Sequence, residues 1–273
     1  MPLAVCATPI GNLGDVTLRV LAELGEADVV LCEDTRRTRI LLDRHGIEAR
    51  RTSFHRLNEA ARGPDVLRQL AGGARVALVS DAGLPGVNDP GARLIAAALE
   101  RDVEVHVLPG PSAVETALVA SGLVGDAYRF VGYLPRRAPE RAALAGELAA
   151  WPDPIVAFES PRRLPASLAA LAAAMPERRA AVCRELTKRF EEVVRGTVAE
   201  LAERFAEPPR GEITLVLGGV PGLARSAASS SSSDDARKAV EELVEAGVRR
   251  RQAADVVARL TGLSRNALYR DSL

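Results

Sequence analysis

Three segments rich in glycine and proline could let a ligand approach the main chain. They are residues 8–15 (TPIGNLGD), 80–91 (SDAGLPGVNDPG) and 108–113 (LPGPSA), and each follows a short apolar run that predicts a buried strand. In open α/β sheets ligands bind at the carboxyl ends of strands, where glycine leaves the backbone accessible. One such loop would be an ordinary turn, whereas three at one sheet edge predict a binding crevice.

The motifs exclude several kinds of site. The chain lacks the GxxxxGK motif of a nucleoside triphosphate site and the GxGxxG dinucleotide fingerprint, and residues 110–114 (GPSAV) lack the second glycine of a GxSxG nucleophile elbow. Cys6, Cys32 and Cys183 lie far apart and share no ligand spacing with the three histidines. We therefore expect no metal site and no disulfide framework.

Charged side chains follow the predicted strand that ends at Cys32. In residues 32–39 (CEDTRRTR), Glu33 and Asp34 come first, Thr35 is a candidate helix cap, and Arg36 opens the helix. This mixture suits a polar, phosphate-bearing substrate, because arginine donates paired hydrogen bonds to phosphate. The alternative is a set of surface ion pairs that contribute little to stability.

Other polar groups follow strands further along the chain. Asp81 comes directly after the apolar run RVALVS, so its carboxylate either binds a ribose hydroxyl or a cation, or caps a turn. In the second half, residues 158–164 (FESPRRL) and 183–192 (CRELTKRFEE) again place acidic and basic side chains after predicted strands. These segments are further candidates for the binding region.

Short apolar runs alternate with longer amphipathic segments, which predicts an α/β fold. The strands expected in the first half are residues 3–7, 28–32, 75–79 and 104–108. Their order predicts a mostly parallel sheet with helices on both faces. The strands expected in the second half are residues 129–134, 155–158, 181–184, 192–196 and 213–217. Some of these follow one another closely, which predicts antiparallel pairs.

Length and charge set further bounds. With 273 residues the chain is long enough for two domains, and its 36 basic and 36 acidic residues cancel, so no global positive field indicates a nucleic-acid partner. Apart from Lys188 and Lys238 the basic residues are arginines, which reflects either codon composition or phosphate binding. Without an apolar stretch of membrane-spanning length or a signal-peptide pattern, we expect a cytoplasmic protein with no membrane partner.

The C-terminal part differs in composition from the rest. Residues 226–235 (SAASSSSSDD) predict a flexible linker, because they offer little apolar surface to bury. Residues 236–273 carry apolar positions at helical spacing, with Gly247 and Gly262 as breaks, and predict a helix-turn-helix-like tail. Its arginines either contact nucleic acid or form a solvated face. The expected domains are therefore residues 1–112 and 113–225, followed by the linker and the tail.

The ordered motifs resemble those of the tetrapyrrole-methylase-like (class III) S-adenosylmethionine-dependent methyltransferases. The matching segments, which span nearly the whole chain, are residues 7–15, 32–38, 55–59, 80–91, 108–113, 129–137, 158–164, 183–192 and 211–219. The chain departs from the usual family pattern at Leu84, Tyr133 and Arg162, where the family has threonine, phenylalanine and histidine. The arginine at position 162 argues against a catalytic role there.

The resemblance implies two α/β domains with S-adenosylmethionine held in the cleft between them, and a homodimer. The cofactor residues that it implies are Pro9, Asp81, Ala82, Leu84, Ser112, Ala113, Phe158, Leu186, Glu212 and Thr214. Several of these are expected to act through backbone N–H and C=O groups.

Within the family, the chain is similar to bacterial members that methylate the 2'-hydroxyl of a cytidine in 16S rRNA of the small ribosomal subunit. A ribose hydroxyl needs a base to accept its proton. The candidates are Glu33 and Glu185, with Arg36 and Lys188 stabilising negative charge. The arginines expected to bind RNA phosphates are Arg36, Arg37, Arg136, Arg137, Arg162 and Arg163.

Two other functions remain open at this point. A tetrapyrrole methyltransferase has the same fold, but such enzymes resemble GxGPGD and GGDP in the first two loops, whereas this chain has TPIGNLGD and SDAGLP. A non-catalytic RNA-binding factor could use the pocket to sense the cofactor, although intact loops in both halves argue against it.

Overall fold

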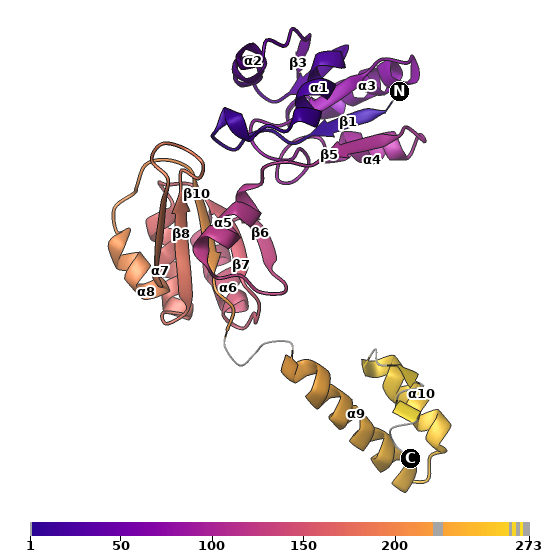
Figure 1. Cartoon of the computed structure of the whole chain (residues 1–273). Helices are drawn as coiled ribbons and strands as arrows, with labels where there is room; N and C mark the ends of the chain where they lie inside the picture. Colours follow the sequence, from indigo (N-terminus) through magenta and orange to yellow (C-terminus); the bar gives the residue numbers. More distant parts are fainter. Residues whose placement is uncertain (1, 221–225, 262–263, 266–267, 270–273) are drawn as a thin grey trace.

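The computed structural model of the chain describes residues 2–220, 226–261, 264–265 and 268–269, and for residues 226–235 it describes the backbone alone. Two sheet-containing domains follow one another along the chain, and a pair of helices follows them (Figure 1). None of the helices in the described ranges is long and apolar enough to cross a membrane.

The N-terminal domain is a parallel sheet in the order β3-β2-β4-β1-β5. Its strands are β1 (Leu3–Cys6), β2 (Val29–Cys32), β3 (Arg51–Ser53), β4 (Val76–Val79) and β5 (Val105–Leu108). Its helices are α1 (Leu18–Glu26), α2 (Thr35–Arg44), α3 (Glu59–Ala71) and α4 (Ala92–Leu99). Alternate residues of β1 enter separate apolar clusters, Leu3 and Val5 on one face and Ala4 and Cys6 on the other. This confirms the predicted parallel sheet with helices on both faces.

The C-terminal domain is a mixed sheet in the order β6-β7-β10-β8-β9. Its strands are β6 (Arg129–Tyr133), β7 (Ile155–Glu159), β8 (Arg179–Arg184), β9 (Glu192–Thr197) and β10 (Ile213–Leu217). Strand β6 pairs with β7 in parallel, whereas β10 runs antiparallel to β7 and β8, and β8 runs antiparallel to β9. The predicted antiparallel pairs are therefore confirmed.

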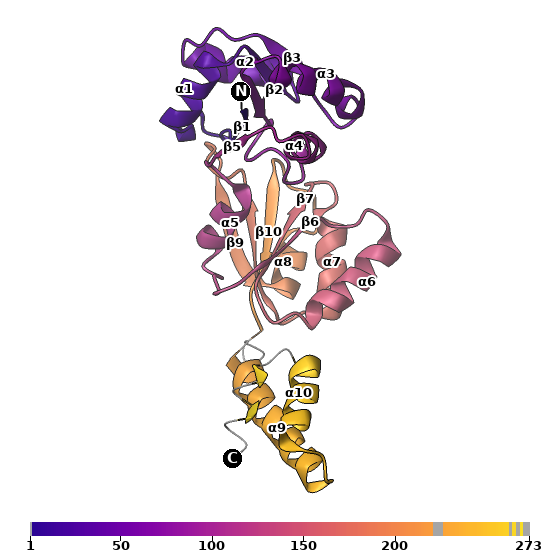
Figure 2. The ribbon, with the colours of Figure 1, turned by 90° about the vertical axis from the view of Figure 1, so that its right-hand side faces the viewer.

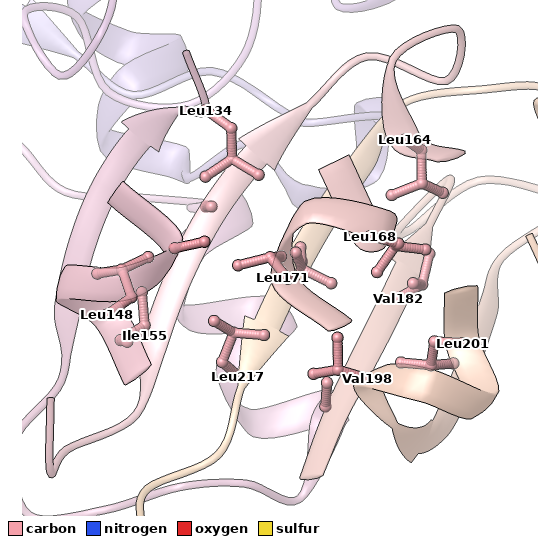
Figure 3. Packing of buried hydrophobic residues seen from close by; sticks show 14 of the residues in the cluster. Leu134, Leu148, Ile155, Leu164, Leu168, Leu171, Val182, Val198, Leu201 and Leu217 are labelled. Atoms are coloured by element: carbon pink, nitrogen blue, oxygen red, sulfur yellow. The ribbon is translucent and has the colours of Figure 1, made fainter. Parts of the chain in front are cut away.

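Helices cover both faces of the second sheet (Figure 2). On one face lie α6 (Ala138–Ala149), α7 (Leu164–Ala174) and α8 (Val198–Arg204), whose leucines and valines pack on the sheet (Figure 3). On the other face lies α5 (Ala113–Ser121), which packs on Val156, Ala181 and Val216. Ser112 is the N-cap of α5, the first helix to pack on this sheet, and the domain boundary after residue 112 stays a prediction.

The described part of the tail contains helices α9 (Ser226–Glu245) and α10 (Arg250–Thr261). They pack through Ala236, Val240, Ala253 and Val257, with the chain turning at Gly247 as predicted. The serine-rich residues 226–235 have helical backbone, which differs from the flexible linker expected there. The physical reason is that serine lowers helix stability only modestly, so an adjoining helix can extend through it. The predicted break at Gly262 and the tail residue Arg270 lie outside the described residues.

Two smaller predictions also need correction. Strand β3 was not expected, because its residues Arg51–Ser53 are mostly polar and half-buried and carry no apolar run. Helix α2 is capped by Asp34 and not by Thr35, since the Asp34 carboxylate accepts a hydrogen bond from the Arg36 backbone N–H at 2.8 Å. The aspartate carboxylate, placed one residue earlier, satisfies the free N–H group at the helix start.

Candidate functional site

A cavity of about 590 Å³ lies where the two domains meet, within the size range of small-molecule sites. The N-terminal domain contributes Ile10, residues 82–84 and 87–89, and the loop 109–112. The C-terminal domain contributes residues from the start of α5, from β6 and β7, and from the loops around Leu186 and Glu212. Neither domain alone forms this cavity, so its shape depends on how the loops of both are held.

The first two glycine-rich loops are joined to each other by hydrogen bonds. The backbone groups of Thr8 and Gly83 exchange two hydrogen bonds, of 2.9 and 3.0 Å. The Thr8 hydroxyl donates to the Ser80 carbonyl at 3.0 Å, and the Ser80 hydroxyl donates to the Gly83 carbonyl at 3.1 Å. The prediction that these loops gather at one sheet edge is therefore correct.

Most of the predicted cofactor residues meet at the cavity. Those that line it are Ala82, Leu84, Ser112, Ala113, Phe158, Leu186, Glu212 and Thr214. Pro9 is buried next to the lining residue Ile10 but does not itself line the cavity. The Asp81 carboxylate points elsewhere, because it accepts a hydrogen bond from the Asp34 N–H at 3.0 Å and lies 3.5 Å from the Arg37 guanidinium. Asp81 thus connects the second loop to the start of α2.

Aromatic rings form part of the C-terminal wall. Phe158 packs edge-on against Phe130 and Tyr133, with ring centroids 5.0 and 5.6 Å away. All three side chains line the cavity, and Tyr133 is 61% exposed. They offer a flat apolar surface on which a ring system can pack.

The predicted catalytic residues do not line the cavity. Arg36 is 89% exposed and pairs with Asp34 at 3.0 Å, on the outer surface of α2. Glu33 is half-buried, and burial together with the charge of Asp81 raises its pKa. The Asp34 cap is the acceptor of two Arg36 side-chain hydrogen bonds, so this arginine is an exposed surface cation.

Glu185 and Lys188 form a network with Glu212. The Lys188 ammonium donates to the Glu185 carboxylate at 2.9 Å and to the Glu212 carboxylate at 2.8 Å. Glu185 also accepts from the Glu212 N–H at 2.9 Å, and this bond, with the ammonium, lowers the pKa of Glu185. A carboxylate with a lowered pKa accepts a proton less readily, so the geometry argues against Glu185 as the base.

The network also joins the two domains. A Cβ atom on Gly11 would lie 2.6 Å from the Lys188 Cγ, so glycine is required where the lysine stem crosses the first loop. Next to it, the Asn12 N–H donates to the Thr187 hydroxyl at 3.1 Å. The loop after β8 is therefore fixed against the first glycine-rich loop.

Similarity to known proteins extends over this whole arrangement. A family model of tetrapyrrole (corrin/porphyrin) methylases matches residues 2–202. The chain belongs to the tetrapyrrole methylase family. A second model, described as the RsmI C-terminal HTH domain, matches residues 230–271 and so covers most of the tail.

Curated relatives match almost from end to end. A protein of Mesorhizobium japonicum named "Ribosomal RNA small subunit methyltransferase I" is 45% identical over 98% of this chain and 90% of its own length. A protein of the same name from Micromonospora olivasterospora is 44% identical over 98% of this chain and 85% of its own length.

Solved structures share the methylase fold at low sequence identity. The methyltransferase CobJ has a TM-score of 0.62 at 21% identity, covering 80% of this chain and 94% of its own. A uroporphyrin-III C-methyltransferase of Thermus thermophilus, solved with S-adenosyl homocysteine, has a TM-score of 0.57 at 20% identity, covering 80% and 97%. These similarities concern the fold.

Two features of the methylase cavity were missed at the sequence level. Asp89 lines it, and burial together with the charge of Glu33 raises the pKa of Asp89 to about 6. In the sequence this residue stands before a proline in VNDPG and reads as an ordinary turn aspartate. The second feature is Glu115, which accepts hydrogen bonds from the hydroxyls of Ser112 and Tyr128. Burial alone would raise its pKa, but these bonds lower it.

The arginines expected to bind RNA fall into two groups. Arg163 is half-buried, pairs with the buried carboxylate of Glu159 and donates to the Leu134 carbonyl at 3.0 Å, so it supports the wall of the cavity. The exposed ones are Arg36, Arg37, Arg136, Arg137 and Arg162. Only this second group has guanidinium groups accessible to a large anionic partner.

Proposed function

We propose that the protein transfers a methyl group from S-adenosylmethionine to the ribose 2'-hydroxyl of a cytidine in 16S rRNA of the small ribosomal subunit. The small subunit is supported by relatives that carry the name "Ribosomal RNA small subunit methyltransferase I" and align with 98% of the chain. The cytidine and its 2'-hydroxyl are supported by the motif resemblance along the chain.

The charge of the cavity is the observation that supports S-adenosylmethionine as the cofactor. Among the described residues that line it, the charged ones are all acidic: Asp89, Glu115, Glu159 and Glu212. S-adenosylmethionine has a sulfonium, an ammonium and one carboxylate, so its net charge is +1, which suits carboxylates among apolar walls. A polycarboxylate such as a tetrapyrrole precursor would find no lysine or arginine to pair with among the described lining residues. The cavity therefore favours the cationic methyl donor over a tetrapyrrole in this space.

The residues present fit this cofactor. The loop around Gly83 and the loop 109–112 bring main-chain groups to the cavity, where they can hydrogen bond to a nucleoside without any particular side chain. Phe158 and Leu186 supply apolar contact. When bound, S-adenosylmethionine supplies a methyl group activated by positively charged sulfur. The role of the protein is to hold that methyl group in line with the nucleophile and to accept a proton.

The RNA is expected to contact the exposed arginines and the tail. Arg36 and Arg37 lie on α2 and Arg136, Arg137 and Arg162 lie on the C-terminal domain, where their guanidinium groups can bind phosphates. The match of residues 230–271 to a helix-turn-helix family also supports a nucleic-acid partner for the tail. Because these contacts are ionic, affinity for RNA should fall steeply with salt.

The test is methyl transfer from labelled S-adenosylmethionine to small ribosomal subunits from a strain that lacks this modification. We expect one 2'-O-methylcytidine in 16S rRNA, located by mapping ribose methylation at nucleotide resolution. Free 16S rRNA, assembled subunits and uroporphyrinogen III serve as alternative acceptors in parallel reactions. Methylation of the tetrapyrrole instead of RNA, or cofactor binding without any transfer, would contradict the proposal.

Two further properties follow from the same family assignment. We expect a homodimer that acts in the cytoplasm, where ribosomal subunits are assembled. Exposed apolar side chains on and after α5, namely Val119 (68% exposed) and Val124 (58%), are consistent with a surface that another copy covers. Light scattering on the purified protein measures the oligomeric state, and a monomer would contradict the expectation.

A further inference from the structure

Asp89 is held in place from both domains. Next to it, the carbonyl of Asn88 accepts a hydrogen bond from the Arg56 guanidinium of the N-terminal domain. The Asn88 amide group also lies so close to β6 that a Cβ atom on Gly132 would be 3.0 Å from its nitrogen. The loop before α4 therefore has its position fixed where it enters the cavity, and Asp89 is part of that fixed segment.

The other carboxylates of the cavity are each held by partners. Glu159 pairs with Arg163, Glu212 pairs with Lys188, and Glu115 accepts bonds from two hydroxyls. Among the lining residues that the structure describes, Asp89 and Glu115 are the carboxylates without a cation within ion-pair distance, and Glu115 is instead held by the two hydroxyls. The Ser80 hydroxyl, which donates to the carbonyls of Ala82 and Gly83, also interacts with the Asp89 carboxylate and lowers its pKa against the larger effect of burial. Asp89 is thus the lining carboxylate that is best able to accept a proton from a ligand.

The charges around Asp89 set its protonation. Burial and the negative charges of Glu33 and Asp81 raise its pKa, while the Ser80 hydrogen bond and the Arg56 guanidinium lower it, leaving a pKa of about 6. Above pH 6 the carboxylate is ionised, yet it is a stronger base than an ordinary exposed aspartate. A base with a pKa near the working pH is the most effective proton acceptor.

We propose that Asp89 is the catalytic base of the methyl transfer, an assignment that rests on the function proposed above. As the ribose oxygen forms its bond to the methyl carbon, the carbon–sulfur bond breaks and its electron pair stays on sulfur, which becomes neutral. The hydroxyl proton passes to the Asp89 carboxylate and from there to water. Atoms and charge balance without any further reactant. Glu33 then acts through Asp89, as a positioning residue that keeps the carboxylate basic.

The experiment compares wild type, Asp89→Asn and the control Asp65→Asn on small subunits, from pH 5 to 9. Asp65 is 61% exposed on α3, so the control makes the same chemical change outside the cavity. For Asp89→Asn we expect kcat to fall by about 10²- to 10⁴-fold, with the Kd for S-adenosylmethionine changed less than about twofold. In wild type and in Asp65→Asn, kcat/KM should fall as the pH drops below about 6, which is the acidic limb of the pH profile. Asp89→Asn should lack this limb.

A second variant tests the electrostatic coupling. Glu33→Gln removes a negative neighbour of Asp89, so the acidic limb of the pH profile should move to lower pH. Asp89→Asn should fold at least as stably as wild type above pH 6, because it removes a buried charge, and thermal unfolding checks this. Retained turnover with an unchanged limb in Asp89→Asn would overturn the assignment, as would an acidic limb that does not move in Glu33→Gln. If wild type does not methylate the RNA, both the proposed function and this assignment fail.

Discussion

At the scale of single residues, Lys188 is the cation that connects the acidic edge of the cavity with the first loop. Its ammonium contacts Glu185 and Glu212, and its stem crosses Gly11. Burial would lower the pKa of Lys188, but the hydrogen bonds that its ammonium donates to both carboxylates outweigh burial and raise the pKa. Lys188 therefore stays charged throughout the physiological pH range and holds the Glu212 side chain at the cavity.

Replacing this lysine should weaken cofactor binding. In Lys188→Met the apolar stem that crosses Gly11 is kept, but Glu185 and Glu212 lose their cation. We expect the Kd for S-adenosylmethionine to rise by about tenfold, equivalent to about 1.4 kcal/mol, measured by titration calorimetry. Lys238→Met, at the other lysine of the chain, is the matched control and should bind normally. Equal affinities for the two variants would contradict this role.

At the scale of elements, Arg178 connects segments that belong to different parts of the second sheet. It lies just before β8, is buried, and donates to the carbonyls of Gly218 and Leu148 at 2.7 Å. It also donates to the carbonyls of Trp151 and Asp153, at 3.0 and 3.2 Å. The guanidinium thereby supplies hydrogen bonds to carbonyl groups at the end of α6, in the turn before β7 and directly after β10. Burial lowers its pKa.

Removal of this guanidinium should be costly. Arg178→Met removes the guanidinium donor from four carbonyls, those of the buried Gly218 and Leu148 and those of the less buried Trp151 and Asp153, so we expect the free energy of unfolding to fall by about 3 kcal/mol. Urea denaturation measures the change. The neighbouring Arg179 is exposed, and Arg179→Met should change stability by less than about 0.5 kcal/mol. A similar small effect for both variants would show that water replaces the guanidinium.

The elements also show what could be predicted from sequence. Strands such as β2 and β4 are buried along their whole length, and this continuous burial requires the apolar runs from which they were predicted. Strand β3 carries no such run, because its residues are half-buried at the edge of the sheet. The position of the glycine-rich loops at the binding crevice was also predictable, since the need for glycine there is visible in the local sequence. The environment of Asp89 and the Lys188 network were not, because their partners are distant in sequence and meet only in the folded chain.

At the scale of the whole molecule, the zero net charge conceals a separation of charges. The cavity is lined by carboxylates, whereas exposed arginines lie on α2, on the C-terminal domain and on the tail. A cationic cofactor and an anionic RNA can therefore be attracted to different surfaces of one protein. Fields of this kind act locally and are screened beyond about 10 Å at 0.1 M salt, so overall neutrality does not argue against RNA binding.

The contribution of the tail can be measured through salt dependence. Arg251 and Arg259 of α10 are exposed, so replacing both with alanine should leave the packing of the tail intact. If each binds a phosphate, the slope of log affinity for the small subunit against log salt should become shallower by about 2, with kcat at saturation unchanged. The matched control replaces the exposed Arg68 and Arg101 of the N-terminal domain. A slope equal to that of wild type would mean that the tail arginines form a solvated face and that RNA binds through the two sheet domains alone.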